Sequence, residues 1–199
     1  MGKTASTKLW VRFALTTTLQ PSSQSGSRGS SSLLIIGVFG SEDCQSIIDE
    51  AETRAGWRIA GAEARDSRVL TLNLRDSFFS SVADRIERKS IPAATQHWGL
   101  KGLRLEELSV VRYNRDAEVP LHTDTGPYKR HRVASIVCYL TDGFIGGDLV
   151  VPRLHFKGIA KLGEAILFPS AELHSATRLT SGDKTVLVGF LWEKTAAWI

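Results

Sequence analysis

Short β-strand patterns separated by turn residues fill the second half of this 199-residue chain. From Leu105 onward, segments rich in β-branched and aromatic residues alternate with glycine-containing turns. We expect strands at residues 108–113, 132–140, 148–151, 165–168, 174–179 and 184–192. Many short strands in succession are typical of a β-sandwich or barrel, in which each strand buries one face.

Two helix patterns precede these strands. Ser41 is a good N-cap residue, and apolar residues recur after it at helical spacing until Gly56. A second apolar face runs from Phe79 to Ile86, and we expect that helix to stop before Pro92, because proline lacks a backbone N–H. Further strands are expected at 33–38, 57–59 and 69–72. The predicted fold is mainly β (α+β), with the helices supporting one sheet.

His122, Asp124 and His174 form a candidate metal site. Two imidazoles and one carboxylate are the ligand set that holds Fe(II) on one face and leaves the opposite positions open. Alternate side chains of a strand point the same way, so the His-x-Asp pair is aligned and the third ligand must come from a distant segment. Glu172 is a competing carboxylate, which ranks below Asp124 because no second histidine lies near it in sequence.

A longer series of motifs surrounds these three residues. In chain order they are Val111-Arg112-Tyr113, Leu121-His122-Thr123-Asp124, Arg132–Leu140, Gly146-Gly147-Asp148-Leu149, Leu167-Phe168-Pro169, Leu173-His174 and Thr180–Lys184. The series resembles the prolyl-4-hydroxylase-like branch of the Fe(II)/2-oxoglutarate-dependent dioxygenases. The resemblance covers roughly residues 33–193 and is most specific from 109 to 192.

The resemblance implies a double-stranded β-helix, or jelly roll, with both metal-binding segments at one mouth. His122, Asp124 and His174 would bind Fe(II). Lys184 would pair with the distal carboxylate of 2-oxoglutarate, and the Tyr113 hydroxyl would hydrogen-bond to the same cosubstrate. A dicarboxylate in a narrow barrel loses its hydration, so a buried cation must replace it.

Several neighbouring residues carry weaker expectations. Arg178 competes with Lys184 as the anchor, because on a continuous strand it would face the same way as His174. In the family, the glycine pair at 146–147 precedes a strand that lines the active site, which makes Asp148 and Val150 candidate cavity residues. The segment ending at Tyr113 is expected to close a strand.

The basic stretch after the metal motif permits two interpretations. The candidates to bind a substrate carboxylate are Tyr128, Arg130 and Arg132, although Arg130 is assigned to the surface. His131 lies in the same stretch, which reads mainly as a solvated loop. His97, His131 and His155 have no partner at ligand spacing, so none is assigned to a site.

The resemblance also implies an activity. Because the carboxylate ligand Asp124 is present, oxygen transfer to an aliphatic carbon is expected, with Fe(II), 2-oxoglutarate and dioxygen as cofactors. The substrate would be a free amino acid or related metabolite, or a peptidyl residue. Two alternatives remain: a jelly-roll metal-binding module without turnover, and a nucleic-acid dealkylase. The dealkylase ranks lower because Arg178 is the only arginine after His174.

The distribution of charge argues against a nucleic-acid partner. The chain has a formal net charge of +4, but residues 1–32 hold four basic and no acidic residues. The remainder therefore carries 21 basic and 21 acidic residues, and has no overall basic field.

Composition also predicts the domain organisation. Residues 1–32 read as a flexible, basic, Ser/Gly-rich extension, and residues 33–199 as one dioxygenase domain. No apolar run is long enough for a membrane span, so no membrane partner is expected. Cys44 and Cys138 read as core residues of a protein in a reducing compartment, and a cytoplasmic location is expected.

Overall fold

The structure is a computed structural model that describes residues 32–60 and 65–194. The expected extension at 1–32 lies outside this range except for Ser32. The strands are β1 (Leu34–Gly37), β2 (Arg58–Ile59), β3 (Arg65–Thr71), β4 (Leu103–His122), β5 (Arg132–Tyr139), β6 (Ile145–Gly146), β7 (Leu149–Val151), β8 (Phe156–Gly158), β9 (Glu164–Pro169), β10 (His174–Ala176), β11 (Leu179–Ser181) and β12 (Lys184–Glu193). The helices are α1 (Ser41–Glu52), α2 (Ser77–Trp98) and a 3₁₀ turn at Pro152–Leu154.

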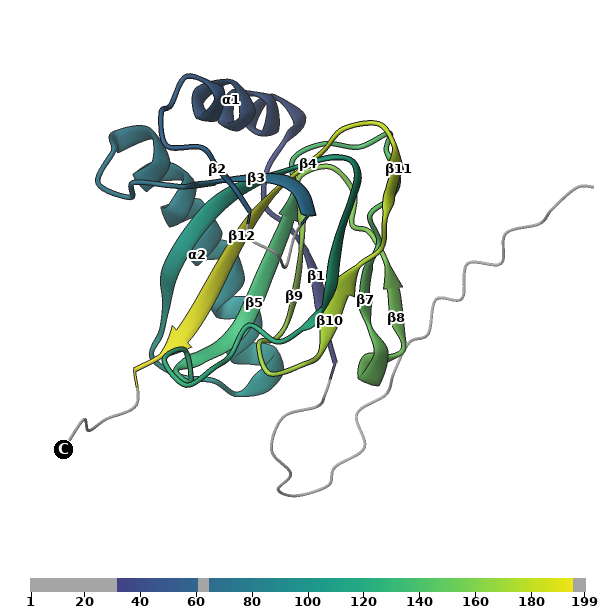
Figure 1. Cartoon of the computed structure of the whole chain (residues 1–199). Helices are drawn as coiled ribbons and strands as arrows, with labels where there is room; N and C mark the ends of the chain where they lie inside the picture. The colour runs from purple at the N-terminus through teal and green to yellow at the C-terminus, as the bar shows by residue number, and fades with distance from the viewer. Residues whose placement is uncertain (1–31, 61–64, 195–199) are drawn as a thin grey trace, which may run out of the picture.

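One curled antiparallel sheet forms most of the molecule (Figure 1). Its strands follow the order β1-β9-β5-β12-β4-β10-β7-β8, and β3 with β2 extends from β4. A separate pair is formed by β11 and β6. The mainly β, α+β class predicted from the sequence is confirmed.

The long strand β4 produces the curl. Its first half pairs with β12 and β3, whereas its last residues pair with β10. Between the two halves, Asp116 has a φ of 72°, a left-handed conformation that aspartate tolerates better than most residues. The expectation that Tyr113 closes a strand was wrong, because β4 bends at Asp116 and continues to His122.

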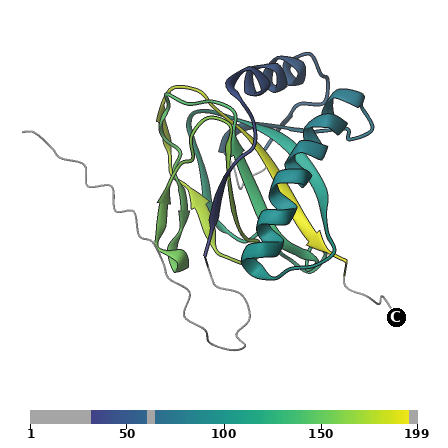
Figure 2. The same cartoon turned by 180° about the vertical axis from the view of Figure 1, so that it is seen from behind.

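Strand alternation divides the core into two clusters. Val110, Cys138 and Leu187 belong to a cluster under the helices, and the next residue on each strand, such as Val111 or Tyr139, belongs to a second cluster. Figure 2 shows α2 lying across the outer face of the sheet, with α1 near one end. The helices thus cover one face, and the opposite face lines the interior of the curl.

Helix α2 is longer than the sequence predicted. Asp76 caps it by accepting hydrogen bonds from two backbone N–H groups, and Gly99 ends it in the left-handed conformation. The expected stop before Pro92 was wrong, because the helix continues six residues further. Beyond the proline, Ala94 is fully buried and Trp98 packs against the core, so tertiary contacts outweigh the lost hydrogen bond.

The segment expected as one strand at 174–179 is divided in two. His174–Ala176 pairs with β4 and β7, and Leu179–Ser181 pairs with β6. Gly146 permits the second pairing: its φ is +81°, and a Cβ there would lie 2.1 Å from the Arg178 carbonyl oxygen. Among the described residues, no helix is long and apolar enough to cross a membrane.

Candidate active site

Two strands bring the histidines together. His122 is the last residue of β4 and His174 the first of β10, and they are direct register partners in an antiparallel pair. Their ring centroids are 4.2 Å apart. Asp124 follows two residues after His122, and its backbone N–H donates to the Ser170 carbonyl oxygen at 3.0 Å. One potential ligand atom from each of the three lies within 4.8 Å of the others.

Backbone carbonyls fix the orientation of both rings. The Nδ1 atom of His122 lies 2.9 Å from the Pro120 oxygen, and that of His174 lies 3.0 Å from the Glu172 oxygen. A carbonyl only accepts, so each Nδ1 carries the proton and each Nε2 presents a lone pair. The lone pairs face Asp124, at 3.6 Å to Oδ1 and 3.4 Å to Oδ2. Two lone pairs and a carboxylate that converge in this way fit a divalent transition metal such as Fe(II).

The electrostatics suit metal ligands as well. Burial alone would raise the pKa of Asp124, but hydrogen bonds and charges from His122, His174 and Ser135 hold it below the usual value. Burial lowers the pKa of His174 to about 4, against the opposing effect of Asp124. At neutral pH the carboxylate is therefore charged and His174 neutral, the forms that bind a metal.

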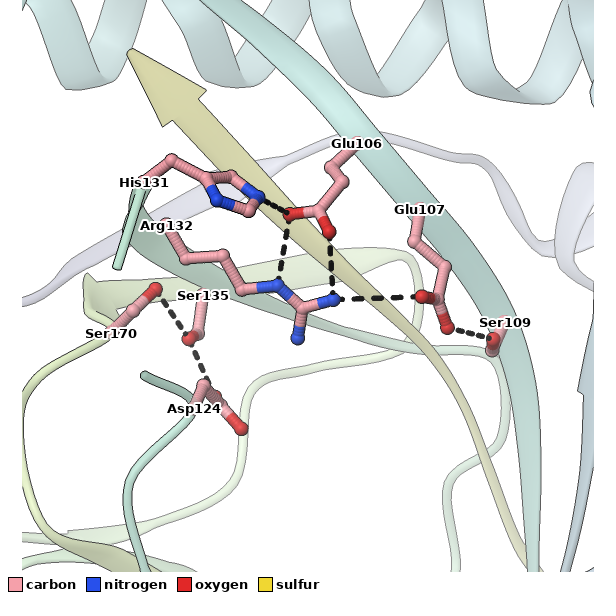
Figure 3. A network of polar contacts seen from close by, with 8 residues as sticks. All are labelled: Glu106, Glu107, Ser109, Asp124, His131, Arg132, Ser135 and Ser170. Carbon is pink, nitrogen blue, oxygen red and sulfur yellow. Dashed lines mark hydrogen bonds and ion pairs between the residues drawn. The ribbon is translucent and has the colours of Figure 1, made fainter. Parts of the chain in front are cut away.

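Two buried serines hold the carboxylate. Ser135 Oγ donates to Asp124 Oδ2 at 2.5 Å, and Ser170 Oγ lies 2.9 Å from Ser135 Oγ (Figure 3). Sequence reasoning assigned neither residue to the site. Ser135 stands two and four residues before Val137 and Tyr139, and this strand alternation was the signal that it faces the interior.

Lys184 and Tyr113 are opposite one another on β12 and β4. The lysine is 2% exposed, its Nζ donates to the Gly147 carbonyl oxygen at 2.7 Å, and no described carboxylate forms an ion pair with it. Burial lowers its pKa to about 8, with Asp148 opposing. Burial, followed by the charge of Asp124, raises the pKa of Tyr113 to about 12.

The two competing candidates, Arg178 as the anchor and Glu172 as the carboxylate ligand, have other partners. The Arg178 side chain is 62% exposed, and its Nε lies 3.0 Å from Asp116. Because the strand breaks after Ala176, Arg178 no longer shares a face with His174. The Glu172 carboxylate accepts from Arg153 Nε at 2.7 Å, and only the Glu172 backbone contacts His174.

A cavity of about 570 Å³ joins the two groups of residues. Its lining includes the three candidate ligands together with Tyr113 and Lys184. On β7 the lining residue is Leu149, so the expectation for Asp148 and Val150 was wrong. Asp148 instead accepts from the Thr177 hydroxyl at 3.2 Å, because the chain turns at the glycine pair before it.

Tyr139 was missed by the sequence analysis. It is fully buried, and its hydroxyl has no hydrogen-bond partner in the described part of the chain. Lys184 Nζ lies 5.5 Å from its ring, and the proximity of Tyr113 and Asp148 contributes, after burial, to a raised pKa of the phenol. A buried hydroxyl without a hydrogen-bond partner is suited to a polar ligand.

The basic stretch after the metal motif divides between surface and interior. Tyr128 is 93% exposed, whereas Arg132 is buried and binds Glu106 through two nitrogens. His131 lies in the expected loop and is partly exposed, but its Nε2 lies 3.1 Å from a Glu106 oxygen, a contact that the sequence analysis did not predict. A partner on β4 was not apparent from sequence spacing.

Comparison with known protein families agrees with this geometry. A family model described as the 2OG-Fe(II) oxygenase superfamily matches residues 108–192. A PKHD-type hydroxylase of Parvibaculum lavamentivorans is 25% identical over 170 residues, which is 79% of this chain and 76% of that protein.

Solved structures show the same fold. A prolyl-4-hydroxylase of Pseudomonas putida has a TM-score of 0.69 at 16% identity, over 83% of this chain and 95% of that one. The viral collagen prolyl hydroxylase of Paramecium bursaria Chlorella virus-1, solved with 2-oxoglutarate, has a TM-score of 0.66 at 21% identity, over 82% and 96%. The curled sheet is therefore the expected jelly roll.

Proposed function

We propose that this chain is a prolyl-4-hydroxylase-like 2OG-Fe(II) oxygenase whose residues are arranged for hydroxylation. It is an Fe(II)- and 2-oxoglutarate-dependent hydroxylase. When bound, Fe(II) supplies the activation of dioxygen that breaks an aliphatic C–H bond. The proposed reaction consumes the substrate C–H, dioxygen and 2-oxoglutarate, and yields the alcohol, succinate and carbon dioxide.

We infer that His122, Asp124 and His174 are the iron ligands. The observation that carries this assignment is the convergence of two Nε2 lone pairs on one carboxylate, with both Nδ1 atoms held by backbone carbonyls. The carbonyls orient the rings, and Ser135 orients Asp124. The chain thus presents three ligands on one side and leaves the cavity side open for cosubstrate and dioxygen.

We assign 2-oxoglutarate to the inner part of the same cavity. Its distal carboxylate would meet Lys184, whose charge has no ion-pair partner among the described residues. The hydroxyls of Tyr113 and Tyr139 would donate to the cosubstrate. Both phenols keep their protons at neutral pH, because burial raises the pKa of each.

The substrate would be a small molecule or a peptidyl residue that enters from the outer side of the ligands. The name of the viral relative, a collagen prolyl hydroxylase, favours a peptidyl residue. The position of the candidate ligands inside a cavity of about 570 Å³ favours a residue or molecule that fits within the curl. No nucleic acid or membrane partner is proposed.

The decisive experiment is anaerobic. Addition of Fe(II) and then 2-oxoglutarate to metal-free protein should produce a visible metal-to-ligand charge-transfer band. The variant His174→Ala should lose the band and the formation of succinate in air, because one of three ligands is removed. The matched control is His155→Asn at an exposed left-handed position that asparagine also tolerates, and it should keep both. Normal turnover by His174→Ala would reject the ligand assignment.

A further inference from the structure

A second cavity, of about 400 Å³, adjoins the first and shares part of its lining. Both cavities are lined by His122 and Asp124. The first extends to Lys184, whereas the second extends to Ser109, Arg132 and Phe190. If 2-oxoglutarate occupies the lysine side, the second cavity is the space left for the substrate. We call it the substrate chamber.

The one arginine in the chamber wall is already neutralised. Arg132 donates to Glu106 through Nε at 2.9 Å and Nη2 at 3.0 Å, and its side chain is 3% exposed (Figure 3). Its guanidinium lies 3.6 Å from the Phe190 ring centroid. A bidentate pair stacked on an aromatic ring leaves little capacity for a further anion. Arg132 therefore does not make the chamber an anion site.

Glu107 is the carboxylate with spare capacity. It lines both cavities, and its side chain is 42% exposed. Its two contacts are long: 3.3 Å from Ser109 Oγ and 3.5 Å from Arg132 Nη2. A carboxylate accepts about four hydrogen bonds. Glu107 can therefore receive new donors from a molecule in the chamber without giving up a strong interaction.

The charges balance once the cofactors are counted. Fe(II) and Lys184 together offset Asp124 and the two carboxylates of 2-oxoglutarate, and Arg132 offsets Glu106. The charged groups that remain in the described lining of the substrate chamber are Glu107 and, at an exposed position, Lys129. One anion and one cation in the same wall complement a molecule that carries both signs of charge.

We propose that the substrate is a small zwitterion of the free amino acid class, with its ammonium on Glu107 and its carboxylate toward Lys129. This inference rests on the proposed function and selects between the two substrate classes left there. A residue within a peptide has neither main-chain charge, so it would offer Glu107 no ammonium group to bind in the chamber.

The test compares charged and neutral forms of the same compounds. The anaerobic Fe(II)/2-oxoglutarate protein is titrated with each protein amino acid, its N-acetyl form, its amide, and short peptides that contain it. Binding is followed by the shift of the charge-transfer band and by calorimetry, and then in air by succinate formation. We expect at least one free amino acid to bind, and N-acetylation to weaken its binding at least tenfold. Equal binding of the N-acetyl form, or a response to peptides alone, would overturn the proposal.

Variants on one strand separate recognition from folding. Glu107→Gln should raise the dissociation constant of the responding amino acid at least tenfold, with the 2-oxoglutarate titration unchanged. Glu118→Gln, an exposed position on the same strand, should change neither. An unchanged constant in Glu107→Gln rejects the role of Glu107. A band without any zwitterion response rejects this inference alone, whereas absence of the band rejects the proposed function.

Discussion

A single residue, Lys184, should make the affinity for 2-oxoglutarate depend on pH. Burial holds its pKa at about 8 in the ligand-free protein, below the usual 10.5. A dicarboxylate needs the charged form, so affinity for 2-oxoglutarate should fall as pH rises above 8, by up to about tenfold per pH unit. Anaerobic titrations of the charge-transfer band between neutral and alkaline pH measure this.

The matched variant for that prediction is Lys184→Arg. Arginine stays charged throughout this range, so any affinity that it retains should not vary with pH. The free energy of unfolding of the ligand-free protein should change in the opposite direction. Between the folded and the unfolded pKa of Lys184, the unfolded chain keeps a proton that the folded protein has lost, so the folded protein should become more stable as pH rises through this range. A wild-type affinity that is independent of pH would contradict the assigned role of Lys184.

The Tyr139 hydroxyl provides a second test at this scale. Because it has no hydrogen-bond partner in the described structure, Tyr139→Phe should leave the melting temperature unchanged or slightly higher. Loss of one hydrogen bond to 2-oxoglutarate, about 1 kcal/mol, should raise its half-saturation concentration roughly fivefold. Lower thermal stability with unchanged cosubstrate affinity would assign Tyr139 a packing role only.

At the scale of the element, helix α2 contains a proline, and the packing of the helix compensates for the hydrogen bond that the proline removes. Pro92 is exposed, six residues before the helix ends. Pro92→Ala restores a backbone donor and should increase the free energy of unfolding by about 1–3 kcal/mol. Urea unfolding followed by circular dichroism measures the change, with Ala93→Gly expected to destabilise by about 1 kcal/mol as the opposite control. A loss of stability in Pro92→Ala would mean that the ring makes contacts the helix needs.

The sequence predicts the positions of strands better than it predicts where a strand continues or breaks. Strand positions within the jelly roll were predicted well, because a period of two residues is visible wherever one face is buried. The continuity of β4 past Tyr113 was not predicted, since its bend depends on one left-handed residue, Asp116. The break between β10 and β11 depends on the close approach of Gly146 to the Arg178 carbonyl, which is a contact between distant segments.

At the scale of the whole molecule, Ser32 marks where the described domain begins. Trp98 Nε1 donates to the Ser32 carbonyl oxygen at 3.2 Å, and the Ser32 hydroxyl lies 2.5 Å from His97 Nε2. We predict that a protein starting at Ser32 keeps the charge-transfer band and a melting temperature within about 2 °C of the full chain. A start at Ile35 should lower the melting temperature, because it removes these bonds and the pairing of Leu34 with Leu167.

Differential scanning calorimetry of the two shortened proteins checks this prediction. A large loss of stability in the protein that starts at Ser32 would mean that residues 1–31 belong to the domain. The predicted boundary between residues 32 and 33 would then be wrong.

The sequence by itself determined the mainly β class and the identity of the candidate ligands. Both follow from local regularities: alternation along strands, and the two-residue spacing of His122 and Asp124. Only the tertiary structure decided the surroundings of these residues. The opposition of His122 and His174, the partner of Arg132 and the spare capacity of Glu107 depend on register between distant strands. Register between distant strands is settled only when whole faces pack against one another.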